Sequence, residues 1–419
     1  MSRLTMILFS LKKGGAGIAA NKFLKLFSDK IPNFQVSSIT QDAAGLNHFI
    51  KRLISLALSK FQYDSNPTKH SLNLFSHKPV TDSFKKHKNV SYHFHWINND
   101  TLSIFDFDKI PSGSIITLHD EWLYCGSEHY YKVHDHTREF ETGYRYFKRG
   151  IFGINWNSLI WKIKLKKLAH REDLIYTVPS SWMLERAKSS AILKKSDVRL
   201  LPNPIDTEVF KNYSEEDSRL FRQSLNIDDE SFMIVFGAIS GSKNKLKGMD
   251  LLRNALIKLK LDVSNINKSN IILVDFGGTL GDNEFCGFRN ISLGHIDDDT
   301  HLAKLFSSAD CVVVPSLVES FGQVAAEALS CSTPVISFNT SGLKDIVLHQ
   351  HTGLVADSYS IESLCNQLFE IIMSSKEDRM KMGENGRKHV IENFSRAVIS
   401  QKYMNVLRDA AKIKKSIIK

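Results

Sequence analysis

The chain has 419 residues, more than one hydrophobic core usually supports, so its length predicts two domains of roughly 200 residues each. Its hydrophobic fraction of 42%, charged fraction of 24% and nine prolines exclude a disordered or fibrous protein. The net charge of +10 admits phosphorylated ligands, nucleic acid or an anionic membrane surface as partners. Since the sequence has no zinc-finger spacing and no glycine-aromatic RNA-binding signature, we expect no nucleic-acid partner.

Cysteine usage and the N-terminal residues predict a cytoplasmic protein. The five cysteines are scattered and never spaced as Cys-x-x-Cys, which is typical of free thiols rather than of disulfides or a zinc site. The first apolar run, residues 4–9, is followed by Lys12 and Lys13 and is too short for the core of a signal peptide. No run approaches about 18 apolar residues, so we expect any membrane contact to be peripheral, on the inner face of the cell membrane.

Short runs rich in β-branched residues alternate with segments of helical period, the pattern of parallel strands joined by crossover helices. The strands predicted in the first half are 5–9, 89–96, 114–118, 174–178 and 198–201. A second series follows at 233–236, 271–276, 311–314 and 335–338. The sequence therefore predicts an α/β protein with two doubly wound, Rossmann-like domains.

The segment Pro202-Asn203-Pro204 predicts the linker between the domains, because each proline lacks an N–H and restricts the residue before it. We therefore expect an N-terminal, acceptor-binding domain over 1–202 and a C-terminal, nucleotide-sugar-binding domain over 203–394. Residues 395–419 follow the second sheet with a helical pattern. We expect them to form a helix that crosses back to the N-terminal domain.

A dense group of polar residues and a glycine follows the predicted strand 311–314. A turn presents Glu319, and a helix that begins near Gly322 can bind a diphosphate through its free N–H groups and its dipole. Glu327, within the first two turns of this helix, can accept hydrogen bonds from two ribose hydroxyls, and Glu319 can reach a sugar hydroxyl. Two glutamates eight residues apart are common on solvated helices, but the order strand, P-S-x-x-E, S-F-G, E-A-L is much more specific.

This order resembles the signature of retaining glycosyltransferases of family 4, and the resemblance extends over nearly the whole chain. It implies the GT-B fold, in which two Rossmann-like domains face each other across a cleft. It also implies that Glu319 contacts the transferred sugar and that Glu327 contacts the ribose of a nucleotide-sugar donor. The main-chain amides around Phe321 and Gly322 are then expected to meet the donor's sugar and phosphate.

Two motifs in the first half are similar to other parts of the same family. Lys13-Gly14-Gly15-Ala16-Gly17 resembles its glycine-rich loop, in which the backbone approaches the diphosphate; a plain strand-to-helix turn is the alternative for Gly14 and Gly15. Thr117-Leu118-His119-Asp120-Glu121-Trp122 closes a strand where open α/β sheets place ligands. It resembles a motif of members that build surface polysaccharides, which implies that His119 approaches the donor sugar. Asp120 can simply hold the loop.

The loop after the first strand of the second domain departs from the family pattern. Relatives carry Gly-Arg and, a few residues later, Lys-Gly, and both cations neutralise the leaving diphosphate. Here Gly237 is followed by Ala238, so the arginine is missing, while Lys247 retains the lysine. Lys243 or Lys245 can replace the arginine, Lys247 can act alone, or the whole cluster can be a solvated loop.

The pairs His93-x-His95 and His134-x-His136 raise the question of a metal site. No neighbouring acidic or cysteine pattern completes such a site, and the resemblance implies that cations and helix dipoles hold the donor instead. We therefore expect no metal and no cofactor, the nucleotide sugar being a substrate.

Residues 144–168 combine seven cations with aromatic side chains and contain no acidic residue. This composition suits an anionic membrane surface, where cations meet lipid phosphates and aromatic rings enter the interface. The alternative is a helix that packs its apolar side on the first domain and leaves its lysines in water.

These features predict a hexosyltransferase that moves a sugar from a nucleotide diphosphate, UDP in preference to GDP, to a lipid-linked saccharide. Bacterial envelope polysaccharide synthesis, of the lipopolysaccharide O-antigen or capsule type, is the expected setting. A sugar-nucleotide epimerase or a phosphorylase of the same fold is the alternative enzyme. A non-catalytic subunit that binds polysaccharide precursors is the alternative of another class. Because no spare carboxylate serves as a general base, we expect retention of the anomeric configuration.

Overall fold

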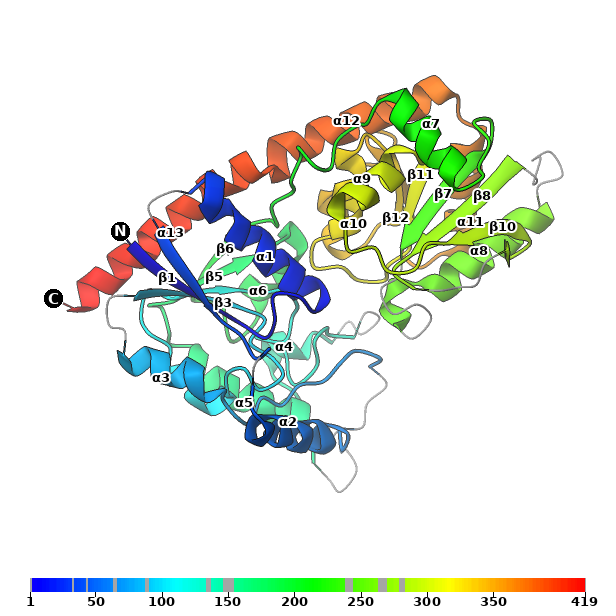
Figure 1. Ribbon diagram of the computed structural model, residues 1–419. Helices are drawn as coiled ribbons and strands as arrows, with labels where there is room; N and C mark the ends of the chain where they lie inside the picture. Colours follow the sequence, from blue (N-terminus) through cyan, green and yellow to red (C-terminus); the bar gives the residue numbers. More distant parts are fainter. Residues whose placement is uncertain are drawn as a thin grey trace. The chain divides into compact units, whose positions relative to one another are not determined.

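The computed structural model describes residues 2–31, 34–42, 44–62, 66–86, 90–132, 137–145, 154–237, 244–262, 270–278 and 283–418. The chain divides into two compact units, Met1–Pro204 with Ile399–Lys419 and Ile205–Val398 (Figure 1). Each unit contains a largely parallel β-sheet with helices, which confirms the predicted α/β class with two Rossmann-like domains. Among the ranges given above, no helix combines the length and the apolar character that spanning a membrane requires.

The first unit is built on a six-stranded sheet in the order β2-β1-β3-β4-β5-β6, in which all neighbours run parallel. The strands are β1 (Ser2–Leu8), β2 (Phe34–Ile39), β3 (Val90–His95), β4 (Ile115–Thr117), β5 (Ile175–Val178) and β6 (Asp197–Leu200). The helices are α1 (Gly14–Asp29), α2 (Leu46–Ser59), α3 (Lys78–Lys86), α4 (Glu139–Thr142), α5 (Trp156–Leu168) and α6 (Ser181–Ser189). The direction in which strands are added reverses between β1 and β3, the point at which open α/β sheets bind ligands.

Both faces of the first sheet are covered, as the alternation of side chains along β1 shows. Leu4, Met6 and Leu8 point to one hydrophobic cluster, and Ile7 points to the other. Since a strand buried on both faces has no polar side, β1 carries apolar side chains on both faces from Leu4 to Leu8, interrupted only by the buried Thr5.

The C-terminal helix α13 (Arg396–Ile418) packs on the first unit, to which its residues from Ile399 onward belong. Tyr403 is fully buried, with its ring centroid 5.3 Å from that of Phe23 and 5.2 Å from that of His93. Arg199 Nη1 lies 2.8 Å from Oδ2 of Asp409, which adds an ion pair between β6 and the helix. A segment remote in sequence therefore completes one face of the first sheet.

The second unit contains a seven-stranded sheet in the order β13-β12-β11-β7-β8-β10-β9, parallel except for the β9–β10 pair. The strands are β7 (Phe232–Gly237), β8 (Ile271–Phe276), β9 (Asn283–Phe285), β10 (Phe288–Ser292), β11 (Cys311–Val314), β12 (Val335–Phe338) and β13 (Gly353–Ala356). The helices are α7 (Glu215–Ser224), α8 (Met249–Asp262), α9 (Asp299–Ser307), α10 (Gln323–Ser330), α11 (Ile361–Met373) and α12 (Lys376–Phe394). Here the strand order reverses between β7 and β11.

The chain enters and leaves the second unit side by side. Ile205 N–H donates to the carbonyl of Phe394 at 2.8 Å, and Arg396 N–H donates to the carbonyl of Ile205 at 3.1 Å. Arg396 Nη1 also lies 2.9 Å from Oδ2 of Asp206. These contacts hold residues 205–206 and 394–396 within the second unit, just beyond the Pro202–Pro204 segment.

We expect Tyr403→Ala to destabilise the first unit by about 3–5 kcal/mol, because it empties a fully buried aromatic site between α1 and β3. All five tryptophans lie between residues 96 and 182, so tryptophan fluorescence during urea denaturation reports on this unit. Tyr403→Phe is the matched control and should cost only about 1 kcal/mol, since it removes just the hydroxyl that contacts His93. Equal stability of the two variants would contradict this packing role.

Candidate functional site

Loops that follow β7 and β11 bring a predicted cation and a predicted acid into contact. Lys247 ends the 3-10 helix η4 (Lys245–Lys247), and its Nζ lies 2.6 Å from Oε1 of Glu319. The two side chains are 29% and 18% exposed, so both remain accessible to a ligand. Because β7 and β11 are the strands at which the sheet order reverses, this ion pair stands where ligands bind in such sheets.

Close backbone packing fixes this ion pair. Gly248 has a φ of +68°, and a Cβ at this position would overlap the carbonyl oxygen of Pro315. The N–H of Leu317 donates to the carbonyl of Leu246 at 2.8 Å, which joins the two loops directly. Glycine at 248 is therefore required for Lys247 to lie beside Glu319.

Two serines hold Glu319 in place. Ser316 Oγ donates to Oε1 of Glu319 at 2.8 Å. The main-chain N–H of Glu319 donates to Oγ of Ser341, also at 2.8 Å. Ser341 begins the 3-10 helix η6 (Ser341–Asp345) after β12, and the N–H of Gly342 donates to the carbonyl of Glu319 at 2.9 Å. Sequence reasoning gave neither serine a role in positioning Glu319. The spacing of Ser316, three residues before Glu319, is a signal that could have indicated the first of these contacts.

The N terminus of α10 has no side-chain cap. Its N-cap is Gly322, with a φ of +108°, and a Cβ there would lie 2.8 Å from Cδ2 of Leu343. By contrast, Ser or Asp side chains accept a first-turn N–H in α7, α9, α11 and α12. The preceding Phe321 is buried, with its ring 5.4 Å from that of Phe394. The start of α10 is thus anchored by packing while its amides remain suited to an anion.

Glu327 lies five residues beyond Gly322 and is only 5% exposed. Gln323 Nε2 donates to its Oε1 at 2.9 Å. A buried carboxylate needs polar partners, and its two oxygens can accept several hydrogen bonds. Its position in the first two turns of α10 agrees with the sequence expectation.

Lys245 is the other described lysine of the predicted cluster. Lys245 begins η4 and is exposed, and Lys243 lies outside the described residues. Lys247 is the one for which the structure records a contact with Glu319.

In the first unit, the glycine-rich loop forms the start of α1. This helix begins at Gly14, whose φ is +75°, and Lys13 at the N-cap makes no side-chain cap hydrogen bond. An ideal Cβ on Gly14 or Gly15 would meet no heavy atom within 4 Å. The backbone is therefore open on this side, at the end of β1 next to the reversal of strand order.

His119 follows β4 and stands at the end of a row of histidines. Its Nε2 lies 2.9 Å from Nδ1 of His95, whose Nε2 lies 3.3 Å from Nδ1 of His93. The hydroxyl of Tyr403 in turn lies 2.5 Å from Nδ1 of His93. The pair first considered for a metal thus supports His119 and links it to α13. Throughout the described part of the chain, no group of three or more His, Cys, Asp or Glu residues is arranged to hold a metal ion.

Burial keeps this row neutral. It lowers the pKa of His119 to about 4 and the pKa of His93 to about 3, and it takes the pKa of His95 well below the ordinary value. The positive charge that each protonated neighbour would bring lowers the pKa of His93 and of His95 further. A neutral imidazole has one N–H and one lone pair, so His119 is a hydrogen-bonding group at pH 7 rather than a cation.

Asp120 holds the loop around His119. It accepts hydrogen bonds from His129 Nδ1 at 2.6 Å, from Trp96 Nε1 at 2.7 Å and from the N–H of Trp122 at 3.0 Å. Burial alone would raise the pKa of Asp120, but His129 and these hydrogen bonds together lower it. Its oxygens are occupied by the protein, which fits the loop-holding alternative.

The described aromatic rings of the basic segment 144–168 pack against the core of the first unit, Trp156 being partly buried there. Tyr144 and Trp161 are buried in the core of the first unit. Lys164 is fully buried and donates to the carbonyls of Trp122 and of Gly126, the latter at 2.6 Å, and burial lowers its pKa. The packing alternative thus describes α5, except that Lys164 lies inside the protein; residues 146–153 lie outside the described residues.

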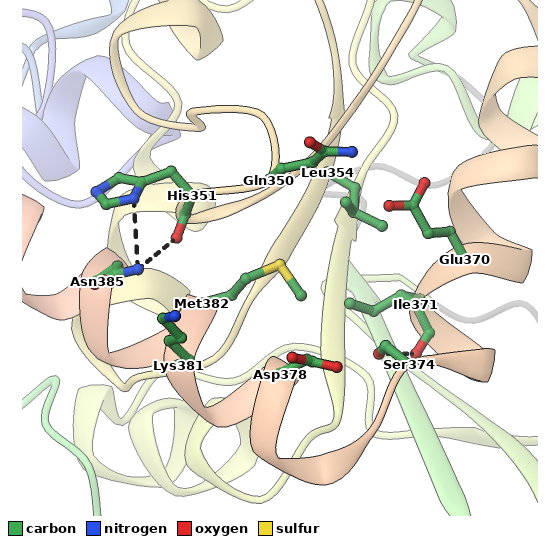
Figure 2. Close-up of a pocket in the computed structure, with 10 residues that line it drawn as sticks. All are labelled: Gln350, His351, Leu354, Glu370, Ile371, Ser374, Asp378, Lys381, Met382 and Asn385. Atoms are coloured by element: carbon green, nitrogen blue, oxygen red, sulfur yellow. Dashed lines mark hydrogen bonds between the residues drawn. The ribbon is translucent and has the colours of Figure 1, made fainter.

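A hollow of about 430 Å³ lies in the second unit, away from these groups. Figure 2 draws ten of the residues that line it. It is lined by the residues at the start of β13, the end of α11 and the first half of α12, such as Gln350, Ser374 and Asn385. The starts of parallel strands lie at the edge opposite to their ends, whereas ligands bind at the ends. None of the predicted site residues lines this hollow.

Comparison with known proteins finds a family match over most of the second unit. Residues 217–389 match the family model for glycosyl transferases group 1. An uncharacterized glycosyltransferase of Methanocaldococcus jannaschii is 32% identical over 216 residues, which are 50% of this chain and 52% of that protein. A D-inositol 3-phosphate glycosyltransferase of Pseudarthrobacter chlorophenolicus is 31% identical over 171 residues, 39% of each chain. The chain thus spans about half the length, or less, of these two relatives.

The fold is similar to that of HepE from Anabaena, whose structure was determined in complex with UDP-glucose. The TM-score is 0.63 at 14% sequence identity, over 98% of this chain and 100% of that one. This likeness concerns the fold alone and confirms the GT-B class predicted from the sequence.

We expect the first unit to lose stability as the pH falls from about 6.5 to about 4. The unfolded chain then binds protons that the folded chain, with the lowered pKa values of His93, His95 and His119, does not bind. Each histidine should contribute about 1.4 kcal/mol per pH unit, and the full stability should be present above pH 6.5. Urea denaturation followed by tryptophan fluorescence at pH 7 and pH 5 measures this slope.

The control for this measurement compares two substitutions. His119→Gln should reduce the slope by the share of one histidine, whereas His170→Gln changes an exposed histidine of the same unit and should leave it unaltered. Identical slopes in wild type and His119→Gln would contradict a lowered pKa of His119.

Proposed function

We propose that the chain is a retaining, metal-independent glycosyltransferase that moves a sugar from a UDP-sugar to a lipid-linked saccharide. The contact between Lys247 and Glu319, in the same unit as the uncapped start of α10, is the observation that carries this proposal. A lysine and a helix N terminus are both suited to a diphosphate. The family match over residues 217–389 covers all of these groups.

In this proposal Lys247 changes partner when the donor binds. Without the donor, it neutralises Glu319. The diphosphate then takes over Lys247, and Glu319 becomes available to a hydroxyl of the transferred sugar. Negative charge grows on the diphosphate in the transition state, so a preorganised cation stabilises that state more than the ground state.

Other groups of the second unit hold the nucleotide. The amides of Phe321 and Gly322 and the first turn of α10 contact the sugar and phosphate, and Glu327 accepts hydrogen bonds from the ribose. Lys243 or Lys245 supplies the second cation in place of the missing arginine. HepE, a fold neighbour, is known in complex with UDP-glucose, which supports uridine over guanosine as the donor base.

The first unit contributes the backbone of Gly14 and Gly15 to the diphosphate and His119 to the donor sugar. Because His119 is neutral, it can exchange a hydrogen bond with a sugar hydroxyl without adding a charge. The open space above both glycines supports the approach of a ligand to this backbone.

Transfer proceeds with retention. The bond between the anomeric carbon and the phosphate oxygen breaks, and the acceptor oxygen bonds to the same face of the sugar. The acceptor proton passes to the departing phosphate, so no general base on the protein is required. Fixed amides and Lys247 stabilise the leaving group, which is the task that a metal ion performs in other enzymes.

The acceptor is proposed to be a lipid-linked oligosaccharide of bacterial envelope synthesis, of the lipopolysaccharide O-antigen or capsule type. The resemblance of 117–122 to members that build surface polysaccharides supports it. The enzyme would then act in the cytoplasm, peripherally bound to the inner face of the membrane. The relative that acts as a D-inositol 3-phosphate glycosyltransferase makes inositol phosphate the second acceptor to test.

The test of this function is transfer from α-linked UDP-sugars to lipid-linked saccharides and to inositol phosphate, with excess EDTA present. We expect an α-linked product, identified by proton NMR of its anomeric centre. A β-linked product, or activity that EDTA abolishes and magnesium or manganese restores, would overturn the mechanism. Epimerised nucleotide sugar without transfer would instead favour the epimerase, and release of a sugar phosphate would favour the phosphorylase. Donor binding without turnover would favour the non-catalytic subunit.

We expect Lys247→Ala to lower kcat about 100-fold with a smaller effect on KM, because the lost cation acts mainly on the developing charge. Steady-state kinetics with a saturating acceptor measures both constants. Lys245→Ala, on the same 3-10 helix, is the comparison and should lower kcat less than Lys247→Ala does. If Lys243→Ala or Lys245→Ala lowers kcat more than Lys247→Ala does, the role belongs to another lysine.

We expect Glu327→Ala to weaken UDP binding by about 1.5–3 kcal/mol, because it removes hydrogen bonds between a charged group and the ribose. Calorimetric titration with UDP measures this affinity, and an unchanged affinity would contradict the role of Glu327.

A further inference from the structure

Helix α2 presents its apolar residues to solvent. Six large hydrophobic side chains on this helix are between 45% and 73% exposed: Leu46, Phe49, Ile50, Leu53, Ile54 and Leu56. Five of them follow the spacing i, i+3, i+4, i+7, i+8, which places them on one side of the helix. We refer to these six side chains as the α2 apolar face.

The opposite side of α2 is polar and faces the protein. His48, Ser55 and Ser59 are buried there. Ser55 Oγ donates to Oδ1 of Asp100 at 2.8 Å, and the ring of His48 lies 4.9 Å from that of His77. These polar contacts and Leu58, which is partly buried against the core of the first unit, hold the helix, so the apolar face does not serve the core. This arrangement is the reverse of that in an ordinary surface helix, and exposed apolar patches of this kind mark interaction sites.

The charges around α2 fit an anionic lipid surface. Residues 44–62 contain no Asp or Glu, but they include Lys51, Arg52 and Lys60. Lys51 and Arg52 are half-buried, with their charges over the rings of Phe75 and Phe9 at 5.9 Å and 4.8 Å, and Lys60 is exposed at the C-cap. An apolar face with flanking cations is typical of helices that lie in the plane of a membrane interface.

The size of the face argues against a stable protein partner. A helix of 14 residues is about 21 Å long, so one face of it offers roughly 200 Å². Stable protein interfaces bury about 800 Å² on each partner. A lipid surface needs no such continuous complementary area.

More cations lie near the end of α2. The N–H of Asn157, in the first turn of α5, donates to Oε1 of Gln62 at 3.3 Å, which places the start of α5 against the end of α2. Lys162 and Lys166 of α5 are exposed. In Figure 1 both helices lie at the margin of the first unit.

We propose that the α2 apolar face docks on an anionic membrane, with its hydrophobic side chains at the boundary between headgroups and acyl chains. Lys60 and the exposed lysines of α5 then meet lipid phosphates. This binding is independent of the proposed transfer reaction, since it requires neither donor nor acceptor. It would bring the first unit to the surface in which a lipid-linked acceptor resides.

The experiment is flotation of the full chain with vesicles of phosphatidylcholine alone or mixed with phosphatidylglycerol. We expect binding to the mixed vesicles that weakens with salt, and a loss of about tenfold or more in partitioning for Phe49→Asp/Leu53→Asp. The matched control is Leu220→Asp/Leu261→Asp, which changes two exposed leucines of the second unit and should bind as wild type does. Phe49→Ser/Leu53→Ser removes the same apolar side chains without adding a negative charge, so its loss of binding cannot come from repulsion by the lipid. Tryptophan fluorescence confirms that each variant is folded.

Three outcomes would overturn the proposal. Undiminished flotation of both α2 double variants would show that the face does not bind lipid. Equal binding to neutral vesicles would remove the anionic surface. A wild-type dimer in lipid-free sedimentation that becomes a monomer in Phe49→Ser/Leu53→Ser would identify a second copy of the chain as the occupant. None of these outcomes bears on transfer activity measured with a soluble acceptor.

Discussion

The candidate site of the second unit depends on the close approach of two backbones, at Gly248 and at Pro315. A side chain at Gly248 would overlap the Pro315 carbonyl, and the loops after β7 and β11 would then have to separate. Their separation would take Lys247 away from Glu319, and it would also break the hydrogen bond between Leu317 and Leu246. Gly322 imposes a similar constraint, since its left-handed conformation starts α10 without a side chain over the first turn. Close packing of the backbone therefore determines where Lys247, Glu319 and the start of α10 lie at this edge of the sheet.

In the first unit, side chains rather than backbone packing position the candidate site residue His119. His119 stands at the end of β4, and the row of His95 and His93 behind it reaches Tyr403 in the C-terminal helix. His93 and Tyr403 are 310 residues apart in the sequence, so α13 supports the sheet edge as well as the core. Because the row is buried and neutral, the imidazole of His119 is positioned by hydrogen bonds rather than by an ion pair.

The sequence predicted the parts of the fold that are buried on both faces. The strands at 271–276, 311–314 and 335–338 are apolar runs interrupted only by Asp275 and Ser337, and the structure has them with these same bounds. It did not predict β2, β9, β10 or β13, because strands at or next to the edge of a sheet are short or partly polar. In the site, motif order placed Glu319 in a turn and Gly322 at the start of a helix. Motif order could not predict the contact of Ser341 with Glu319 or of His95 with His119, because each joins segments that only the folded chain brings together.

Helices α5 and α2 show why composition does not determine what a helix contacts. The cations and rings of α5 suggested a membrane surface, yet Trp161 is buried and Lys164 donates to two carbonyls inside the protein. The periodicity of α2 would place its apolar side in the core, yet Ser55 and Asp100 hold the polar side inward. In both cases a few buried polar contacts decide the orientation, since an unpaired buried polar group costs more than an exposed apolar one. If α2 binds lipid, the surface that recruits the acceptor belongs to the first unit, and the Lys247–Glu319 pair belongs to the second. Substitutions can then change membrane binding and turnover separately, because the two sets of residues belong to different units.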